Sequence, residues 1–219
     1  MKKIGLIVGL IGLFTANTYA QEDTKAKAIL DELSKKTKAH KTIYAEFEFS
    51  LENEAEKVSE TQKGFIYSKG EKYYLSLGGQ EIICDGKTIW TYMKDAKEVQ
   101  ISDVPAEGES TEDYVDPNKI FTIYETGFNY KHIKTLEKNG KTYELINLYP
   151  KKPAEKPYHT VRLSIDKTEM VINKIMIKGK DGSTYTYSIN KFEANKAMED
   201  SRFTFDTTKH PDVEVIDLR

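Results

Sequence analysis

Residues that could carry out catalysis are few in this chain, and they do not form a catalytic set. The only cysteine, Cys84, follows Ile82 and Ile83 in an apolar run, which is typical of a small buried residue and not of a nucleophile. The four histidines are far apart and lack metal-ligand spacing, so we expect surface or cap residues at His40, His132, His159 and His210. The sequence contains no serine elbow, zinc-protease motif or phosphate-binding glycine loop. It therefore predicts a binding protein, with no catalytic residue, metal site or cofactor.

An acidic group is the one candidate for a cation site, and it comprises Glu107, Glu109, Glu112, Asp113 and Asp116. It lacks the regular alternation of a calcium loop, so we interpret it as a solvated loop. The residues that follow predict a short helix, with Asp116 as N-cap, Pro117 in the first position and Gly127 as C-cap. Its apolar side chains, Ile120, Phe121, Ile123 and Tyr124, are many for its length. We expect it to lie over the concave face of a sheet.

The N-terminal residues 1–20 have the pattern of a secretory signal peptide. Lys2 and Lys3 precede the apolar run from Ile4 to Phe14, and small residues lead to Ala20. An uncleaved amphipathic anchor is the alternative. No cysteine stands at the cleavage site, so we expect residues 21–219 to be exported to the periplasm as a single unanchored domain. Without Lys2 and Lys3 the formal charge of −2 becomes −4, which argues against a nucleic-acid partner.

Hydrophobic periodicity predicts one helix followed by a long series of strands. Ala26, Ile29, Leu30 and Leu33 have helical spacing, with Thr24 as the expected N-cap. From Ile43 the period changes to two. Further strands are expected at 64–68, 72–77, 80–84, 88–93, 130–136, 142–149, 158–166, 171–178 and 183–192, with a last strand after a turn at His210-Pro211-Asp212. Short turns join neighbouring strands, among them a tight two-residue turn at Asp85-Gly86. The pattern predicts a mainly β fold, with about ten or eleven antiparallel strands in one large curved sheet or barrel.

Four stretches, in order, resemble the LolA-type family of periplasmic outer-membrane lipoprotein carriers. The hairpin "DGKTIWTY" is similar to the family's Asp-Gly-Lys-Thr-Leu-Trp-x-Tyr hairpin. "IYAEFEFS" resembles its first strand, and "DPNKIFTIYETGF" stands where the family has its lid helices. "RFTFDTTKHPDVEVIDL" resembles its closing segment. Together these stretches span nearly the whole chain after residue 20.

The resemblance implies an unclosed β-barrel whose helices cap a hydrophobic cavity for the acyl chains of lipoproteins. It also implies loading by an inner-membrane lipoprotein-releasing ABC transporter and delivery to the outer membrane, with an acceptor there as a possible further partner. One departure indicates a divergent branch: relatives have an arginine that holds the lid shut, and Gly70 stands at its position. Lys69 lacks the planar fork that would replace it. We expect a monomer.

Alternation and aromatic content indicate which side chains line the cavity. We predict acyl contacts for Phe47, Phe49, Tyr73, Leu75, Trp90, Tyr92, Ile175 and Ile177, with Ile120, Phe121, Ile123 and Tyr124 as the lid. For each of these residues taken singly, an ordinary core position is an equally good interpretation. Two alternative functions remain open on the same fold: a periplasmic lipid- or glycolipid-binding protein, and a lipid-sensing regulatory module.

Overall fold

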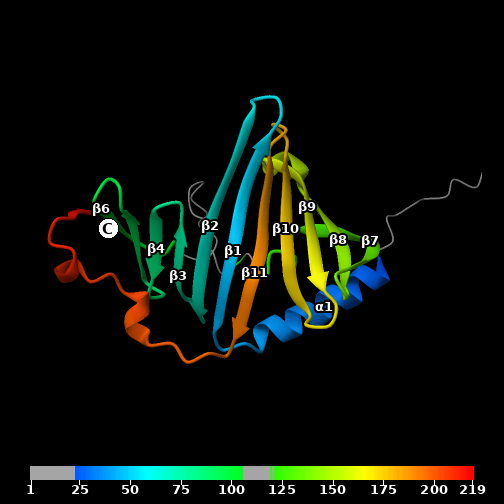
Figure 1. The fold of residues 1–219 in the computed structure, drawn as a ribbon, viewed down its shortest axis with the longest axis horizontal. Helices are drawn as coiled ribbons and strands as arrows, with labels where there is room; N and C mark the ends of the chain where they lie inside the picture. Colours follow the sequence, from blue (N-terminus) through cyan, green and yellow to red (C-terminus); the bar gives the residue numbers. More distant parts are fainter. Residues whose placement is uncertain (1–22, 106–118, 120) are drawn as a thin grey trace, which may run out of the picture.

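The structure, a computed structural model, describes residues 23–105, 119 and 121–219. Its main element is one curved, unclosed sheet of twelve strands in the order β12-β6-β5-β4-β3-β2-β1-β11-β10-β9-β8-β7 (Figure 1). Neighbouring strands are antiparallel, apart from the parallel pair of β12 and β6. The predicted mainly β fold with a single N-terminal α-helix is thereby confirmed. No helix in the described part of the chain is both long and apolar enough to cross a membrane.

The secondary structure follows the alternation of the sequence with two additions. The elements are α1 (Thr24–Lys38), β1 (Ile43–Asn53), β2 (Val58–Lys69), β3 (Lys72–Leu77), β4 (Gln80–Cys84), β5 (Thr88–Met93), β6 (Glu98–Asp103), β7 (Phe128–Lys138), β8 (Lys141–Pro150), η2 (Pro153–Glu155), β9 (Tyr158–Asp166), β10 (Val171–Gly179), β11 (Thr184–Ala194), η3 (Asp200–Phe203), η4 (Thr207–Lys209) and β12 (Glu214–Asp217). Strand β6 was not predicted, because only Val99 and Ile101 alternate in it. Strand β2 begins six residues before the predicted start at Gly64, because its polar first half pairs with β1.

Helix α1 begins one residue earlier than predicted. Asp23, and not Thr24, is the N-cap: one carboxylate oxygen accepts from the amide of Ala26 at 3.0 Å. Its other oxygen accepts from the backbone amide of His132 on β7 at 2.8 Å. The capping residue therefore also joins α1 to the edge of the sheet.

Two of the three Asx-Gly turns, at Asn139-Gly140 and Asp85-Gly86, differ in type. Asn139 and Gly140 both have positive φ angles, +53° and +72°, and form the two-residue turn between β7 and β8. The predicted two-residue turn at Asp85-Gly86 is instead a three-residue loop, in which only Gly86 has a positive φ. The Asp85 carboxylate accepts from the amides of Lys87 and Thr88, both at 2.9 Å, which stabilises the longer loop.

The two faces of the sheet are covered by different segments. We call the face that contacts α1 the inner face and the opposite face the outer face. Leu30 and Leu33 of α1 pack on inner-face residues of β8 and β9, including Ile146 and Leu163. At the other end of the sheet, Phe205 of the C-terminal segment packs on the outer face, against Ile83 and Val99. The inner-face residues Tyr73, Cys84 and Ile89 are buried at this end as well, so the C-terminal segment adds a second covered face there.

Candidate functional site

Six of the eight predicted acyl-contact residues lie together on the inner face. The strand register places them there: Phe47, Phe49, Tyr73, Leu75, Ile175 and Ile177. Tyr73 and Ile175 are each 1% exposed and Phe47 is 7% exposed, so these three belong to the core of the structure. Phe49, Leu75 and Ile177 are only half-buried. The accessible part of the inner face is therefore centred on Phe49, Leu75 and Ile177.

Trp90 and Tyr92 lie on the outer face, which contradicts their predicted place in the cavity. Trp90 is paired with Ile83, and the register continues from Ile83 through Tyr74 and Tyr67 to Tyr44 on β1. Tyr44 points away from the side of its neighbour Ala45, since successive residues of a strand face opposite sides. Both aromatic residues of β5 pack with the C-terminal Phe205 instead.

Several apolar residues outside the predicted acyl-contact set extend the inner face. Leu77, Tyr187, Ile189 and Phe192 are half-buried beside the cluster of Phe47, Ala45 and Ile66. The rings of Phe49 and Tyr187 are 5.1 Å apart, and those of Phe47 and Tyr187 are 6.0 Å apart. Alternation along β3 and β11 was the available signal for these residues.

A glycine makes room for Phe47 on this face. Gly64 is directly opposite Phe47 in the pair of β1 and β2. A Cβ atom on Gly64 would lie 2.7 Å from the Phe47 ring and 2.7 Å from the Ser76 carbonyl oxygen. The absence of a side chain at Gly64 therefore allows the aromatic ring to lie against the sheet.

The segment of residues 121–127, which we call the lid segment, lies between α1 and the inner face. Phe121 is 7% exposed and joins the cluster of Phe47 and Ile66, while Tyr124 is 4% exposed and packs with Leu30 and Leu33 of α1. Ile123 is half-buried beside Tyr124. The predicted lid residues Phe121, Ile123 and Tyr124 are thus brought together on the inner face. Ile120 and the predicted cap Asp116 lie outside the described residues.

The backbone of the lid segment forms tight turns. The amide of Thr122 donates to the carbonyl of Lys119 at 3.1 Å. The amide of Glu125 donates to the carbonyl of Thr122 at 3.0 Å. These are i to i+3 hydrogen bonds, typical of 3₁₀ geometry and not of an α-helix. Gly127, with a φ of +81°, ends the segment in the left-handed conformation predicted for it.

Glu125 fastens the lid segment to α1. Its carboxylate accepts a hydrogen bond from the hydroxyl of Ser34, and its second oxygen lies 2.9 Å from the ammonium group of Lys38. Burial pushes the pKa of Glu125 upward, but the Ser34 hydrogen bond and the Lys38 charge outweigh it and hold the pKa below its usual value. We call Ser34, Lys38 and Glu125 the lid latch. Nothing in the sequence pairs these residues, because 91 positions separate Ser34 from Glu125.

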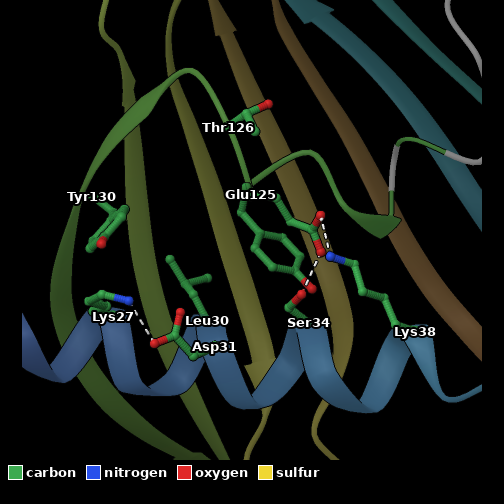
Figure 2. A pocket seen from close by; sticks show the side chains of 9 residues that line it. Lys27, Leu30, Asp31, Ser34, Lys38, Glu125, Thr126 and Tyr130 are labelled. Carbon is green, nitrogen blue, oxygen red and sulfur yellow. Dashed lines mark hydrogen bonds and ion pairs between the residues drawn. The ribbon is translucent and has the colours of Figure 1, made fainter.

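A hollow of about 350 Å³ opens between α1 and the lid segment. Figure 2 shows its lining: Lys27, Leu30, Asp31, Ser34 and Lys38 from α1, Glu125 and Thr126 from the lid segment, and Tyr130 from β7. Most of these side chains are polar or charged, whereas a site for acyl chains is apolar. The hollow is therefore a polar depression beside the latch, separate from the half-buried apolar residues of the inner face.

The residues at the position of the relatives' arginine take no part in this latch. Gly70 has a φ of +60° in the turn between β2 and β3. The ammonium group of Lys69 lies 2.6 Å from the Asp200 carboxylate and 3.2 Å from the Met198 carbonyl. Lys69 thus binds the segment that leads to η3, and the contacts of the lid segment with α1 come from Glu125.

Comparisons with known proteins agree with this architecture. A curated relative, the uncharacterised protein MJ0687 of Methanocaldococcus jannaschii, is 26% identical over 197 residues. The alignment covers 90% of this chain and 55% of the relative, so the chain spans about half the length of the protein it matches. A solved structure of a conserved protein from Thermus thermophilus is 11% identical with a TM-score of 0.56, over 88% of this chain and 99% of that one. This likeness concerns the fold alone.

A solved LolA superfamily protein from Nitrosomonas europaea is also similar, with 11% identity and a TM-score of 0.43, over 83% of this chain and 98% of that one. The family described as "Outer membrane lipoprotein carrier protein LolA" matches residues 38–206 of the 219. Members of this superfamily are binding and carrier proteins. Because the match covers well over half of the sequence, the chain belongs to the LolA family.

Proposed function

We propose that this protein is a periplasmic carrier that holds the acyl chains of lipoproteins against its inner face and takes them from the inner to the outer membrane. One observation carries the proposal: the apolar inner face is wider than α1 and the lid segment, and several of its side chains are only half-buried beside the lid segment. These are Phe49, Leu75, Leu77, Ile177, Tyr187 and Ile189. Membership of the LolA family supports lipoproteins as the class of cargo.

The energetics of acyl binding explain why a carrier needs a lid. Burial of one methylene group stabilises a complex by about 0.8 kcal/mol, so a dozen on one chain amount to roughly 10 kcal/mol. A ligand bound so tightly does not leave into water quickly. Phe121 and Tyr124 already pack on the inner face and α1, so an incoming acyl chain replaces their contacts. This exchange reduces the net affinity and makes release a transfer to another apolar site.

Export and partners complete the proposal. Residues 1–20, expected to be a signal peptide cleaved near Ala20, lie outside the described residues. In the proposed itinerary an inner-membrane lipoprotein-releasing ABC transporter loads the carrier, and a receiving apolar site at the outer membrane accepts the cargo. The lid latch of Ser34, Lys38 and Glu125 takes the place of the relatives' arginine in holding the lid closed.

Native mass spectrometry tests the proposal with the chain from Gln21 and a purified triacylated lipoprotein, in acylated and unacylated forms. We expect a one-to-one complex with the acylated form only. Replacement of Phe121 and Tyr124 by Ser should speed loading and slow release, because the lid no longer competes for the inner face. The matched control replaces Phe65 and Tyr67, a Phe–Tyr pair on the outer face of β2, and should leave loading and release unchanged.

Three results would contradict the carrier function. Binding of both forms would indicate a module that recognises the protein part of the cargo. Retention of free fatty acid without either lipoprotein would indicate a lipid-binding protein that does not carry lipoproteins. Unchanged loading and release in the lid variant would show that the lid segment does not compete with acyl chains.

A further inference from the structure

The charges of this protein are separated along its sheet. Residues 128–183, which contain β7 to β10, have twelve Lys and Arg against six Asp and Glu, a net charge of +6. Residues 43–103, which contain β1 to β6, have seven Lys against twelve Asp and Glu, a net charge of −5. The whole chain has a net charge of only −2. In the sheet β7 is one edge strand, and β1 to β6 extend from the middle toward the other edge, which β12 forms (Figure 1). The molecule therefore has a basic end and an acidic half.

The basic end presents its cations on the outer face. The register of β7 to β10 places Lys131, Lys134, Arg162, Lys174 and Lys178 there, on the side opposite Ile146 and Leu163. Lys131, Lys134 and Lys174 are exposed, and none of the three forms an ion pair with a residue that the structure describes. Their charges are therefore available to an external partner.

Apolar side chains accompany these cations. Among the described residues, five large hydrophobic side chains are strongly exposed, and three of them belong to β7 and β8: Ile133 at 38%, Leu136 at 37% and Tyr149 at 37%. Among residues 23–105, 119 and 121–219, the segments that cover other parts of the sheet pack elsewhere. Helix α1 and the lid segment lie on the inner face, and the C-terminal Phe205 packs near β4 to β6. We call the outer face of β7 to β10 the basic face.

We propose that the basic face docks on a lipid bilayer rich in anionic phospholipid. Lysine side chains around isolated Ile, Leu and Tyr residues fit the boundary between head groups and acyl chains, where cations contact phosphate and apolar groups enter the bilayer. An acidic protein would attract the same lysines, but it gives no reason for exposed apolar side chains among them. The acidic half at β1 to β6 is repelled by an anionic leaflet, so the charge separation also orients the molecule at the membrane.

Vesicle co-sedimentation tests this inference with the chain from Gln21. We compare vesicles that contain 30% phosphatidylglycerol with vesicles of phosphatidylcholine alone. Binding to the anionic vesicles should weaken as salt is raised, because salt screens charges that are exposed. One basic side chain near an anionic leaflet strengthens binding by about fivefold. The triple variant Lys131→Glu, Lys134→Glu and Lys174→Glu should therefore bind at least roughly 100-fold more weakly.

A matched variant separates the basic face from overall charge. Lys41→Glu, Lys63→Glu and Lys87→Glu make the same charge change at exposed positions elsewhere, and this variant should bind the anionic vesicles far better than the first triple variant. Leu136→Ser should weaken vesicle binding at every salt concentration, because the loss is apolar. Equal circular dichroism spectra and melting temperatures would show that all variants are folded.

The inference does not depend on the proposed carrier function, and the two can fail separately. The vesicles contain no lipoprotein, and the basic face is on the side of the sheet opposite the lid segment. Equal binding to both kinds of vesicle, equal losses in the two triple variants, or no binding to anionic vesicles would each overturn the docking proposal. The lipoprotein complex in native mass spectrometry would be unaffected by any of these outcomes.

Discussion

The Tyr124 hydroxyl is a polar group that the closed lid segment buries. Burial raises the pKa of Tyr124 and the nearby Thr37 hydroxyl offsets this only in part, while the Tyr124 oxygen is buried without a hydrogen bond of normal geometry to the described residues. A buried hydroxyl without a partner costs about 1–3 kcal/mol. The apolar contacts of the lid segment and the latch therefore stabilise its closed conformation, whereas burial of the Tyr124 hydroxyl destabilises it.

We expect Tyr124→Phe to stabilise the closed protein by about 1 kcal/mol, because the ring contacts remain and the desolvated hydroxyl is removed. Urea unfolding measures this change. Tyr44→Phe is the control, since the Tyr44 hydroxyl donates to Glu46 at 2.7 Å and its loss should give no gain. A less stable Tyr124→Phe variant would show that the hydroxyl has a partner in solution.

Glu125 makes the lid latch sensitive to acid. A carboxylate whose pKa is lowered in the folded state stabilises that state above its ordinary pKa, and this stabilisation is lost as the pH falls through the lowered value. Glu125 has such a lowered pKa, because Ser34 and Lys38 outweigh its burial. The latch is therefore complete at neutral pH and is lost in acid, below the ordinary value of 4.5.

We expect the lid segment of Glu125→Gln to open more often at neutral pH. We also expect the increase in opening that the unmodified protein shows in acid to be absent from this variant. Hydrogen exchange of the Thr122 and Lys151 amides, which donate to Lys119 and Gly127, reports on the opening. The partly exposed ion pair is worth at most about 1 kcal/mol, so exchange should increase by up to about fivefold. Glu32→Gln, on an exposed site of α1, should change nothing; equal exchange in both variants would exclude the latch.

At the scale of elements, α1 is tied to the sheet edge by a buried carboxylate. Glu144 on β8 is 2% exposed, and one of its oxygens lies 2.6 Å from the His132 ring nitrogen and 2.8 Å from the Thr135 hydroxyl. Lys25 of α1 lies 3.4 Å from the same oxygen. Burial alone would raise the pKa of Glu144. These hydrogen bonds and the Lys25 charge outweigh burial, so the pKa lies below its usual value. Polar contacts therefore fasten the N-terminal end of α1 to β7 and β8. The latch fastens the C-terminal half of α1 to the lid segment.

Asp23→Ala should destabilise the protein by about 1–2 kcal/mol, because the N-cap of α1 is lost together with the bond to the His132 amide. Chemical denaturation measures the loss. Asp31→Ala removes only an exposed pair with Lys27 on the same helix and should cost no more than about 0.5 kcal/mol. Equal losses in the two variants would mean that the link to β7 adds nothing.

At the scale of the whole molecule, the two faces of the sheet separate the proposed acyl site from the only tryptophan. Trp90 is on the outer face with Phe205, whereas Phe49 is half-buried on the inner face. Acyl binding should therefore leave Trp90 fluorescence nearly unchanged.

A tryptophan at position 49 should instead report binding by a shift of its emission to shorter wavelength. Fluorescence titration of the unmodified protein and of Phe49→Trp with a fatty acid makes this comparison. A large change of Trp90 emission in the unmodified protein would place the ligand on the outer face.

The sequence alone determined the elements and the family resemblance, because both depend on local signals. Alternation from Ile43 predicted the first strand, and Asn139-Gly140 has the turn chemistry that its hairpin requires. The faces of Trp90 and Tyr92 were also encoded, since each hairpin switches the parity of the inner-face residue numbers, which are odd in β1, β3 and β5 and even in β2 and β4. The prediction for these two residues failed because it grouped aromatic residues by type and not by register.

Only the tertiary structure decided which distant polar residues meet. Ser34 and Glu125, and likewise Asp23 and the His132 amide, come together because α1 packs across the sheet edge. No periodicity records such a contact, since a charged residue on a helix or turn has the same local pattern whether it meets solvent or a partner. The basic face arises in the same way: its lysines and Arg162 are dispersed along β7, β9 and β10, and antiparallel pairing places them on one surface.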